Sequence, residues 1–362
     1  MSGAPAAKRA RAPALDAVVS TLAVPGLGLP DGLFVLEDGN RLACAGHSLR
    51  VVAPSGLLPA LTLAGRSGEH GKQDGPGADA RFNVPVGITV DPAGQTVVVD
   101  SDNHALRLVS KAGAVSTLAG GGAAGFVDGQ GAAARFNKPH SVVVLPDSGE
   151  FVVSDFLNHA LRVVTLGGGV RTLAGSGQPG FADGQGAAAR FNGPAGLALD
   201  ADGRSVLVAD QGNHAVRRVT MAGAVSTVAG NGEAGFADGE GAAARFHRPV
   251  AVVADKEGTI VVADMDNHRL RKIRGGQVTT LAGGSEAGAA DGAGAGARFK
   301  KPKRLALDER GRLLVVEQGR EDTLRVVEAG LAPPAWMGPA GATEAERKDV
   351  DPVLQNYGKL LE

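Results

Sequence analysis

The sequence is poor in aromatic side chains and in cysteine. Aromatic residues make up only 4% of the 362 residues, so a core must be built mainly from smaller aliphatic side chains. Cys44 is the only cysteine, which excludes an internal disulfide and gives no sign of an oxidising compartment. The 37 basic and 38 acidic residues nearly cancel, so no overall field attracts the chain to nucleic acid or to a membrane.

Long apolar runs are also missing. No stretch approaches the roughly 20 apolar residues that a transmembrane helix needs. Residues 1–16 lack the apolar region of a secretory signal and carry Lys8, Arg9 and Arg11. We therefore expect residues 1–16 to be a disordered basic tail, and we expect a cytoplasmic protein, with the nucleus as the alternative location.

Glycine, by contrast, is abundant, with 55 residues, and it accompanies a repeat of about 54 residues. Ala-Arg-Phe recurs with its arginine at Arg81, Arg135, Arg190, Arg245 and Arg298, and a proline follows each arginine four residues later. Each unit holds four short runs rich in Val and Leu, bounded by turn residues; in one unit they span 196–200, 204–210, 215–220 and 224–230. This pattern predicts an all-β fold, a six-bladed β-propeller with four antiparallel strands in each blade.

The count of strands predicts how the ring closes. The segment VVSTLA at 18–23 matches the fourth strand of a unit but precedes the first unit, and the sixth unit ends near residue 328 without a fourth strand. We expect the N-terminal strand to complete the last blade, which leaves only short outer blade edges unpaired. The propeller then covers residues 17–328.

A short polar motif identifies the units further. The segment 210–217, Asp-Gln-Gly-Asn-His-Ala-Val-Arg, resembles an NHL repeat, and the same pattern recurs in phase in units two to five. The first unit keeps only His47 of the Asn-His pair, and the sixth has Glu317 and Asp322 instead. The resemblance implies a propeller that serves as a platform for proteins or RNA, although a few relatives are lyases or bind calcium.

We interpret the repeated polar residues as architecture, because a catalytic constellation would be needed only once. Aspartate is expected to accept backbone N–H bonds at the turn, and histidine to lie at its far side. The repeated arginines are expected to tie neighbouring blades, and they are Arg50, Arg107, Arg162, Arg217, Arg271 and Arg325. The alternative for the histidines is a ring of partly exposed imidazoles; no zinc site is expected, because each histidine lies on a different blade.

A glycine motif needs a separate interpretation. Gly175, Gly177 and Gly180 have the spacing of a dinucleotide-binding loop, but the motif recurs from Gly120 and from Gly230, and no full helix follows it. We interpret it as the crossover between blades and expect no cofactor. The loop aspartates are expected to cap the next turn, and they are Asp74, Asp128, Asp183, Asp238 and Asp291. The phenylalanines that follow are expected to wedge between blades.

Basic residues that do not recur give the candidate partner-binding surface, because the scaffold does not require them. They are Lys138, His140, His247, Arg248, Lys300, Lys301, Lys303 and Arg304, and the repeated His104, His159, His214 and His268 lie on the same predicted face. We interpret this face as a basic rim that binds an acidic protein or peptide, on a monomeric, non-catalytic interaction platform without metal. The alternatives are solvated charges without function, an RNA-binding propeller, and a metal-dependent lyase or hydrolase.

The composition changes at the C-terminus. Residues 329–344 are typical of a linker, and residues 345–362 carry apolar side chains at helical spacing. We expect an amphipathic helix that docks on the propeller or a partner, or that begins a further domain. The segment resembles the lead-in to a BTB/POZ domain, which would make the propeller the substrate-recognition part of a ubiquitin-ligase adaptor.

Overall fold

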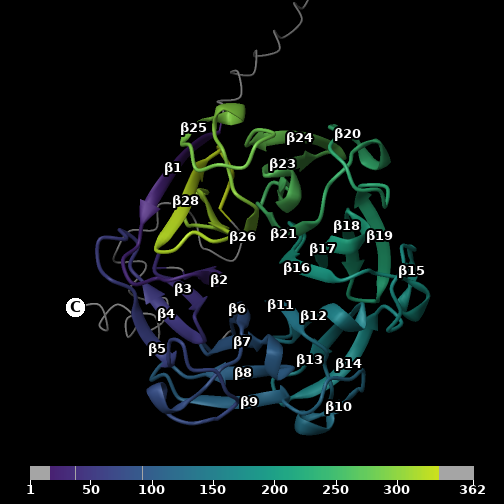
Figure 1. Cartoon of the computed structure of the whole chain (residues 1–362). Coiled ribbons are helices and arrows are strands. Elements are labelled where there is room, and N and C mark those ends of the chain that lie inside the picture. The colour runs from purple at the N-terminus through teal and green to yellow at the C-terminus, as the bar shows by residue number, and fades with distance from the viewer. Residues whose placement is uncertain (1–16, 37, 92, 334–362) are drawn as a thin grey trace, which may run out of the picture.

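The computed structural model describes residues 17–36, 38–91 and 93–333 (Figure 1). These residues form six antiparallel sheets arranged as a ring, so the predicted six-bladed, all-β propeller is confirmed. The predicted N-terminal tail, most of the linker and the C-terminal helix lie outside the described residues. No described helix is long and apolar enough to cross a membrane.

Each blade is a meander that starts at the ring axis and ends at the periphery. The first three blades contain β2 (Pro30–Val35), β3 (Arg41–Ala45), β4 (Ser48–Val52) and β5 (Leu61–Gly65); β6 (Pro85–Val90), β7 (Thr96–Asp100), β8 (Ala105–Val109) and β9 (Val115–Gly120); and β11 (Pro139–Val144), β12 (Phe151–Asp155), β13 (Ala160–Val164) and β14 (Gly169–Ala174). The last three contain β16 (Pro194–Leu199), β17 (Ser205–Asp210), β18 (Ala215–Thr220) and β19 (Ala224–Ala229); β21 (Pro249–Ala254), β22 (Ile260–Asp264), β23 (Arg269–Arg274) and β24 (Gln277–Ala282); and β26 (Pro302–Leu307), β27 (Leu313–Glu317), β28 (Thr323–Glu328) and β1 (Val18–Ala23).

The N-terminal strand closes the ring, as predicted. β1 pairs with β28 in antiparallel register from Val18 opposite Glu328 to Ala23 opposite Thr323. Figure 1 shows the purple β1 beside the yellow β28, although some 300 residues separate them in the chain. Val19 is buried in the last blade, so closure stabilises the ring through apolar contact as well as through the ladder.

The outer edges of four blades are covered, so the expectation that they stay unpaired is wrong. The crossover loop that enters each of these blades adds a two-residue fifth strand to its outer edge; these strands are β10 (Gly129–Gln130), β15 (Gly184–Gln185), β20 (Gly239–Glu240) and β25 (Gly292–Ala293). An added strand hides backbone groups that would otherwise be free to pair with another chain.

Short 3-10 turns complete the repeat. One set precedes each Ala-Arg-Phe segment or its equivalent and comprises η1 (Gly77–Asp79), η3 (Gly131–Ala133), η5 (Gly186–Ala188), η7 (Gly241–Ala243) and η9 (Gly294–Gly296). The other set joins the second and third strands of a blade and comprises η2 (Ser101–Asn103), η4 (Phe156–Asn158), η6 (Gln211–Asn213) and η8 (Met265–Asn267).

Apolar side chains fill the spaces between neighbouring blades. One core cluster joins the third blade to the fourth, from Leu145 to Val225, with the crossover residue Phe191 inside it. Phe82, Phe136, Phe246 and Phe299 take the same place between other blades and are fully buried, as predicted for wedges. Burial of such a side chain stabilises the fold by about 1.5–3 kcal/mol, so these wedges fix each blade against the next.

Candidate functional site

The propeller has two faces with different loops. The crossovers and the Asn-His turns η2, η4, η6 and η8 lie on one face, because the odd strands of a blade run away from it and the even strands return to it. We call this the Asn-His face. The opposite face carries the turns between first and second strands and between third and fourth strands.

A clasp of aspartate, asparagine and arginine holds each Asn-His turn. In the third blade, Asp155 accepts hydrogen bonds from the Asn137 backbone N–H (2.7 Å), the Asn158 amide (2.8 Å) and Arg162 (2.8 Å). Burial raises the pKa of Asp155 to about 6 even though these bonds favour the charged carboxylate. Asp100, Asp210 and Asp264 make the equivalent contacts in their blades, which supports the architectural interpretation.

The repeated arginine ties its blade to the crossover loop that leads into it, rather than to the neighbouring blade. Arg162 donates through Nη2 to Asp128 Oδ1 (2.5 Å) and the Val127 carbonyl (2.9 Å), both in that loop. Asp128 also accepts from the Thr172 backbone N–H (3.0 Å), so the predicted capping role of the loop aspartates is wrong. The 3-10 turn that follows has no side-chain cap.

The first and sixth blades hold the turn between their second and third strands in different ways. In the sixth blade, Glu317 replaces aspartate and accepts from Arg325 (3.2 Å), which also pairs with Asp291 (2.9 Å). In the first blade, a tight turn at Gly46 and His47 replaces the 3-10 turn, and Arg50 donates to the Gly26 carbonyl. One blade can therefore be built without the carboxylate clasp.

The repeated histidines bridge consecutive blades. Each adopts the left-handed conformation, with φ of 49° at His159, and its Nδ1 accepts a backbone N–H from the next blade, such as that of Gly193 (3.0 Å). His47, His104, His214 and His268 repeat this bond at 3.1–3.2 Å. In the sixth unit Asp322 replaces histidine and accepts from the Gly28 N–H (2.6 Å), which closes the ring.

This bond also explains the ionisation of the histidines. Burial lowers the pKa of His104, His159, His214 and His268, so the neutral ring that can accept at Nδ1 is favoured. The architectural role therefore occupies one nitrogen of each ring. Partner binding by these histidines stays a prediction.

Three of the predicted rim residues share one backbone position. Lys138, Arg248 and Lys301 each directly precede the proline of an inner strand and have φ of 48°, 53° and 49°. Their side chains are 49%, 49% and 42% exposed and form ion pairs, Lys138 with Asp102 (3.2 Å) and the other two with Asp266 (3.6 and 3.4 Å). Lys300 is exposed beside Lys301, and the half-buried His247 ring lies 5.8 Å from that of His214.

His140, Lys303 and Arg304 do not belong to the exposed rim, so their predicted placement is wrong. They lie at the start of inner strands, which point their side chains toward the axis or a neighbouring strand. Lys303 pairs with Asp31 Oδ1 (2.5 Å). Arg304 Nη2 contacts His140 Nε2 (3.0 Å), and because these residues come from the sixth and third blades, which are opposite one another, the contact spans the axis.

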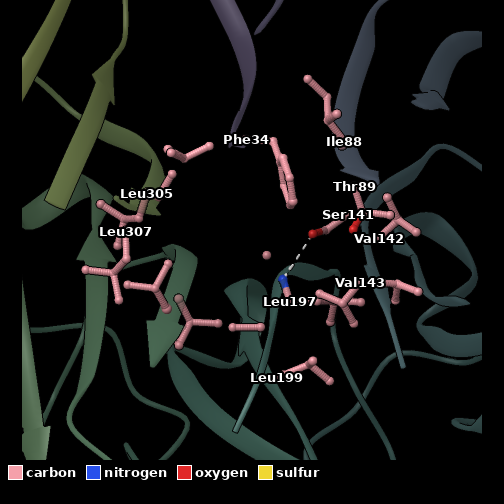
Figure 2. Close-up of a pocket in the computed structure, with 18 of the residues that line it drawn as sticks. Phe34, Ile88, Thr89, Ser141, Val142, Val143, Leu197, Leu199, Leu305 and Leu307 are labelled. Carbon is pink, nitrogen blue, oxygen red and sulfur yellow. Dashed lines mark hydrogen bonds between the residues drawn. The ribbon is translucent and has the colours of Figure 1, made fainter. Parts of the chain in front are cut away.

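The axis itself is a cavity of about 610 Å³ that sequence reasoning missed. Its wall is formed by the inner strands of all six blades and is mainly apolar, and Figure 2 shows Phe34, Ile88, Leu197 and Leu305 around an open centre. The signal was present, since inner strands such as PAGLAL and PVAVVA are apolar on both of their faces. A strand with one face on solvent would alternate instead.

The glycine motif lies in the crossover from β14 to β16, as predicted. Gly175 has φ of +97°, and a Cβ there would lie 2.5 Å from the His159 carbonyl oxygen. Only glycine fits this close approach. In the part of the chain that the structure describes, no group of three His, Cys, Asp or Glu side chains could hold a metal ion.

Comparison with known proteins agrees with this architecture. A model of the NHL repeat matches residues 136–164, 191–218 and 246–273, the ranges that contain three of the clasps. The chain is 31% identical over 275 residues to Protein SUPPRESSOR OF QUENCHING 1, chloroplastic, from Arabidopsis thaliana, covering 71% of this chain and 26% of that protein. It is 29% identical over 341 residues to NHL repeat-containing protein 2 from Bos taurus, covering 83% of this chain and 46% of that protein.

Solved structures share the fold at low sequence identity. An auxiliary nutrient binding protein from Bacteroides thetaiotaomicron superposes with a TM-score of 0.65 at 16% identity, covering 87% of this chain and 76% of that one. A gluconolactonase from Xanthomonas campestris gives 0.57 at 13% identity, covering 86% and 89%. Ring, closing strand and clasp thus define a six-bladed β-propeller of repeated units. The chain belongs to the NHL-repeat propellers, and it spans less than half the length of the two relatives described above.

Proposed function

We propose that this propeller is a non-catalytic binding module that takes an acidic protein or peptide on its Asn-His face. The observation that carries the proposal is the chemistry at the position before the inner-strand proline. Lys138, Arg248 and Lys301 hold a left-handed backbone there, which costs about 1–2 kcal/mol for a residue with a Cβ. Gly193 and Val84 occupy the same position in two other blades, so the scaffold fixes this backbone but does not require a cation there. Three exposed cations that the scaffold does not require are explained by a role at the surface.

The distribution of charge supports an acidic partner. Around the boundary of the fifth and sixth blades, Arg248 and Lys301 both pair with the carboxylate of Asp266, and Lys300 is exposed beside Lys301. The Asn-His turn holds the backbone of this patch, because His268 accepts the Lys301 N–H (3.2 Å) and His214 accepts the Arg248 N–H (3.1 Å). A rigid backbone with mobile cationic tips attracts anionic groups and loses little entropy on binding.

The test is a charge reversal with a matched control. The variant K138E/R248E/K301E changes three cations on the Asn-His face, and the control K111E/R274E/R310E changes three on the opposite face by the same total charge. Each chain is titrated with a 12-residue Asp/Glu-rich peptide at low and moderate salt, and proteins captured from a lysate are compared by mass spectrometry.

We expect wild type and control to bind the peptide more weakly as salt rises, and the first variant to lose binding and its captured proteins. Equal binding by all three chains would overturn the proposal. Capture that disappears after ribonuclease treatment, while peptide binding is absent, would favour the RNA-binding alternative.

A further inference from the structure

A side-chain contact crosses one end of the central cavity, which we call the closed end, and the other end reaches the surface. At the Asn-His face, the contact between Arg304 and His140 crosses the axis, and both side chains line the cavity. At the opposite face, the cavity is lined by turn residues that include the exposed Pro146, Ala201 and Lys256. A ligand would therefore enter from the face opposite the proposed partner surface.

The wall between these ends is an apolar surface, and its contact with water is unfavourable in free energy. It is built from Val, Leu, Ile, Ala and Phe side chains on all six inner strands (Figure 2). The hydroxyl oxygen of Ser141, on this wall, already accepts the Leu197 N–H (3.1 Å), and Thr89 is buried. A cavity of about 610 Å³ is in the range of roughly 300–1,000 Å³ that holds small organic molecules.

The closed end carries a cation that has no carboxylate of its own. Arg304 donates to the carbonyls of Asp31 (2.6 Å) and Lys303 (2.9 Å) and to His140, which uses three of its five N–H groups. Among the described residues no carboxylate pairs with Arg304, because the carboxylate of Asp31 is taken by Lys303. Burial lowers the pKa of Arg304 to about 10, so it remains charged at neutral pH.

His140 holds Arg304 in place across the axis. Because arginine can only donate, Nε2 of His140 must accept the bond from Arg304, and the proton of the neutral ring is then on Nδ1. This Nδ1 is buried beside the backbone of Ala195 and does not reach the cavity. Burial and the charge of Arg304 hold the pKa of His140 well below its usual range, which keeps the ring neutral. A cation with two unused N–H groups beside a neutral ring favours an anionic acceptor.

We propose that the central cavity binds an elongated apolar monocarboxylate, with its carboxylate at Arg304 and its hydrocarbon body along the inner strands. Carboxylates at the open end of the cavity limit how many negative charges a bound ligand can carry. Asp91, Asp200 and Asp255 lie there, held by the Gln95 N–H, Arg218 and the Thr259 N–H. They outnumber Lys256, which also lies at this end, and would repel a second carboxylate, so a diacid of the same length should bind more weakly.

The experiment compares three ten-carbon probes on the full chain by calorimetry: decanoate, decanol and decanedioate. We expect decanoate to bind with one-to-one stoichiometry, and the alcohol and the diacid to bind roughly ten- to hundredfold more weakly, as for loss of a charge-assisted hydrogen bond. If decanol binds as tightly as decanoate, or decanoate does not bind, the proposal is wrong.

Variants test the two halves of the site. R304Q should weaken decanoate by a similar factor and leave decanol unchanged, whereas R310Q, on the exposed turn of the same blade, should change neither. A198W should block all three probes because Ala198 lies on the cavity wall, and A222W on an exposed turn is its control. Unchanged decanoate binding by a folded R304Q would overturn the carboxylate end. If R304Q does not fold, the probe series and A198W decide.

Discussion

Replacing Arg162 by methionine tests whether the clasp is a structural device, as its geometry implies. Arg162 makes four hydrogen bonds, two to the carboxylates of Asp155 and Asp128 (2.8 and 2.5 Å) and two to carbonyls in the crossover (3.1 and 2.9 Å). Methionine keeps part of the apolar contact with the Phe126 and Phe136 rings, over which the guanidinium lies at 4.9 and 5.3 Å. The substitution therefore removes the bonds and the charge more than the packing.

The cost follows from the carboxylate left behind. Asp155 is fully buried, and removing one partner of a buried ion pair costs about 3–5 kcal/mol, a large share of the roughly 5–15 kcal/mol by which domains are stable. R162M should lower the free energy of unfolding by that amount at neutral pH. R171M, which removes an arginine 53% exposed on the adjacent strand, should change it by less than about 0.5 kcal/mol.

The pH dependence gives a sharper signature. The pKa of Asp155 is raised by burial to about 6 with Arg162 present, and losing the cation raises it further. An acid whose pKa is higher in the folded state contributes stability at low pH and loses it as pH rises through the folded value. The cost of R162M should therefore be smaller at pH 5 than at pH 7.5, measured by urea unfolding. The double variant D155N/R162M should cost less than the sum of its single changes. A cost below 1 kcal/mol, or one independent of pH, would refute the buried-clasp reasoning.

Two further predictions concern the Asn-His turn and the crossover glycines. Burial lowers the pKa of His159, so below about pH 6.5 the unfolded chain binds more protons than the folded chain, and stability falls as pH drops. The amide oxygen introduced by H159N can accept the Gly193 N–H, so this variant should lose less stability than wild type between pH 7.5 and 5 in urea unfolding. An equal loss would contradict the assignment. G175A should lower the free energy of unfolding by about 2–5 kcal/mol, because the φ of +97° adds to a 2.5 Å clash of the new Cβ with the His159 carbonyl oxygen. The control G186A, at a φ of +55° with no neighbour within 4 Å, should lower it by about 1–2 kcal/mol. Equal urea midpoints for the two variants would show that the close approach at Gly175 is relieved by other shifts.

Much of the fold was predictable because the same sequence motifs recur in each blade. The phase of Ala-Arg-Phe located the crossovers, and the misplaced strand at 18–23 revealed the closure with β28. The repeated Asp155, Asn158 and Arg162 were recognised as architecture for the same reason, although the partner of Arg162 was not. Asp128 looks like a turn cap in the sequence, and only the folded chain shows that it lies against Arg162 and Thr172.

For the candidate site residues too, the sequence predicted the placement of some, and only the structure showed the placement of others. Lys138, Arg248 and Lys301 stood out from the repeat in the sequence, and the structure added that they share one strained backbone position. His140, Lys303 and Arg304 stood out equally, but they lie two or three residues further along the chain than Lys138 and Lys301, where the side chains point toward the axis or a neighbouring strand.

By itself, the sequence determined the number of blades, the strand that closes the ring and the polar residues of each turn, because these depend on neighbours within one unit or on its exact repetition. Only the tertiary structure decided what lies on the axis. Arg304 and His140 are 164 residues apart and meet because six twisted blades place the third opposite the sixth. The apolar cavity beside them belongs to no single repeat, since all six inner strands form its wall.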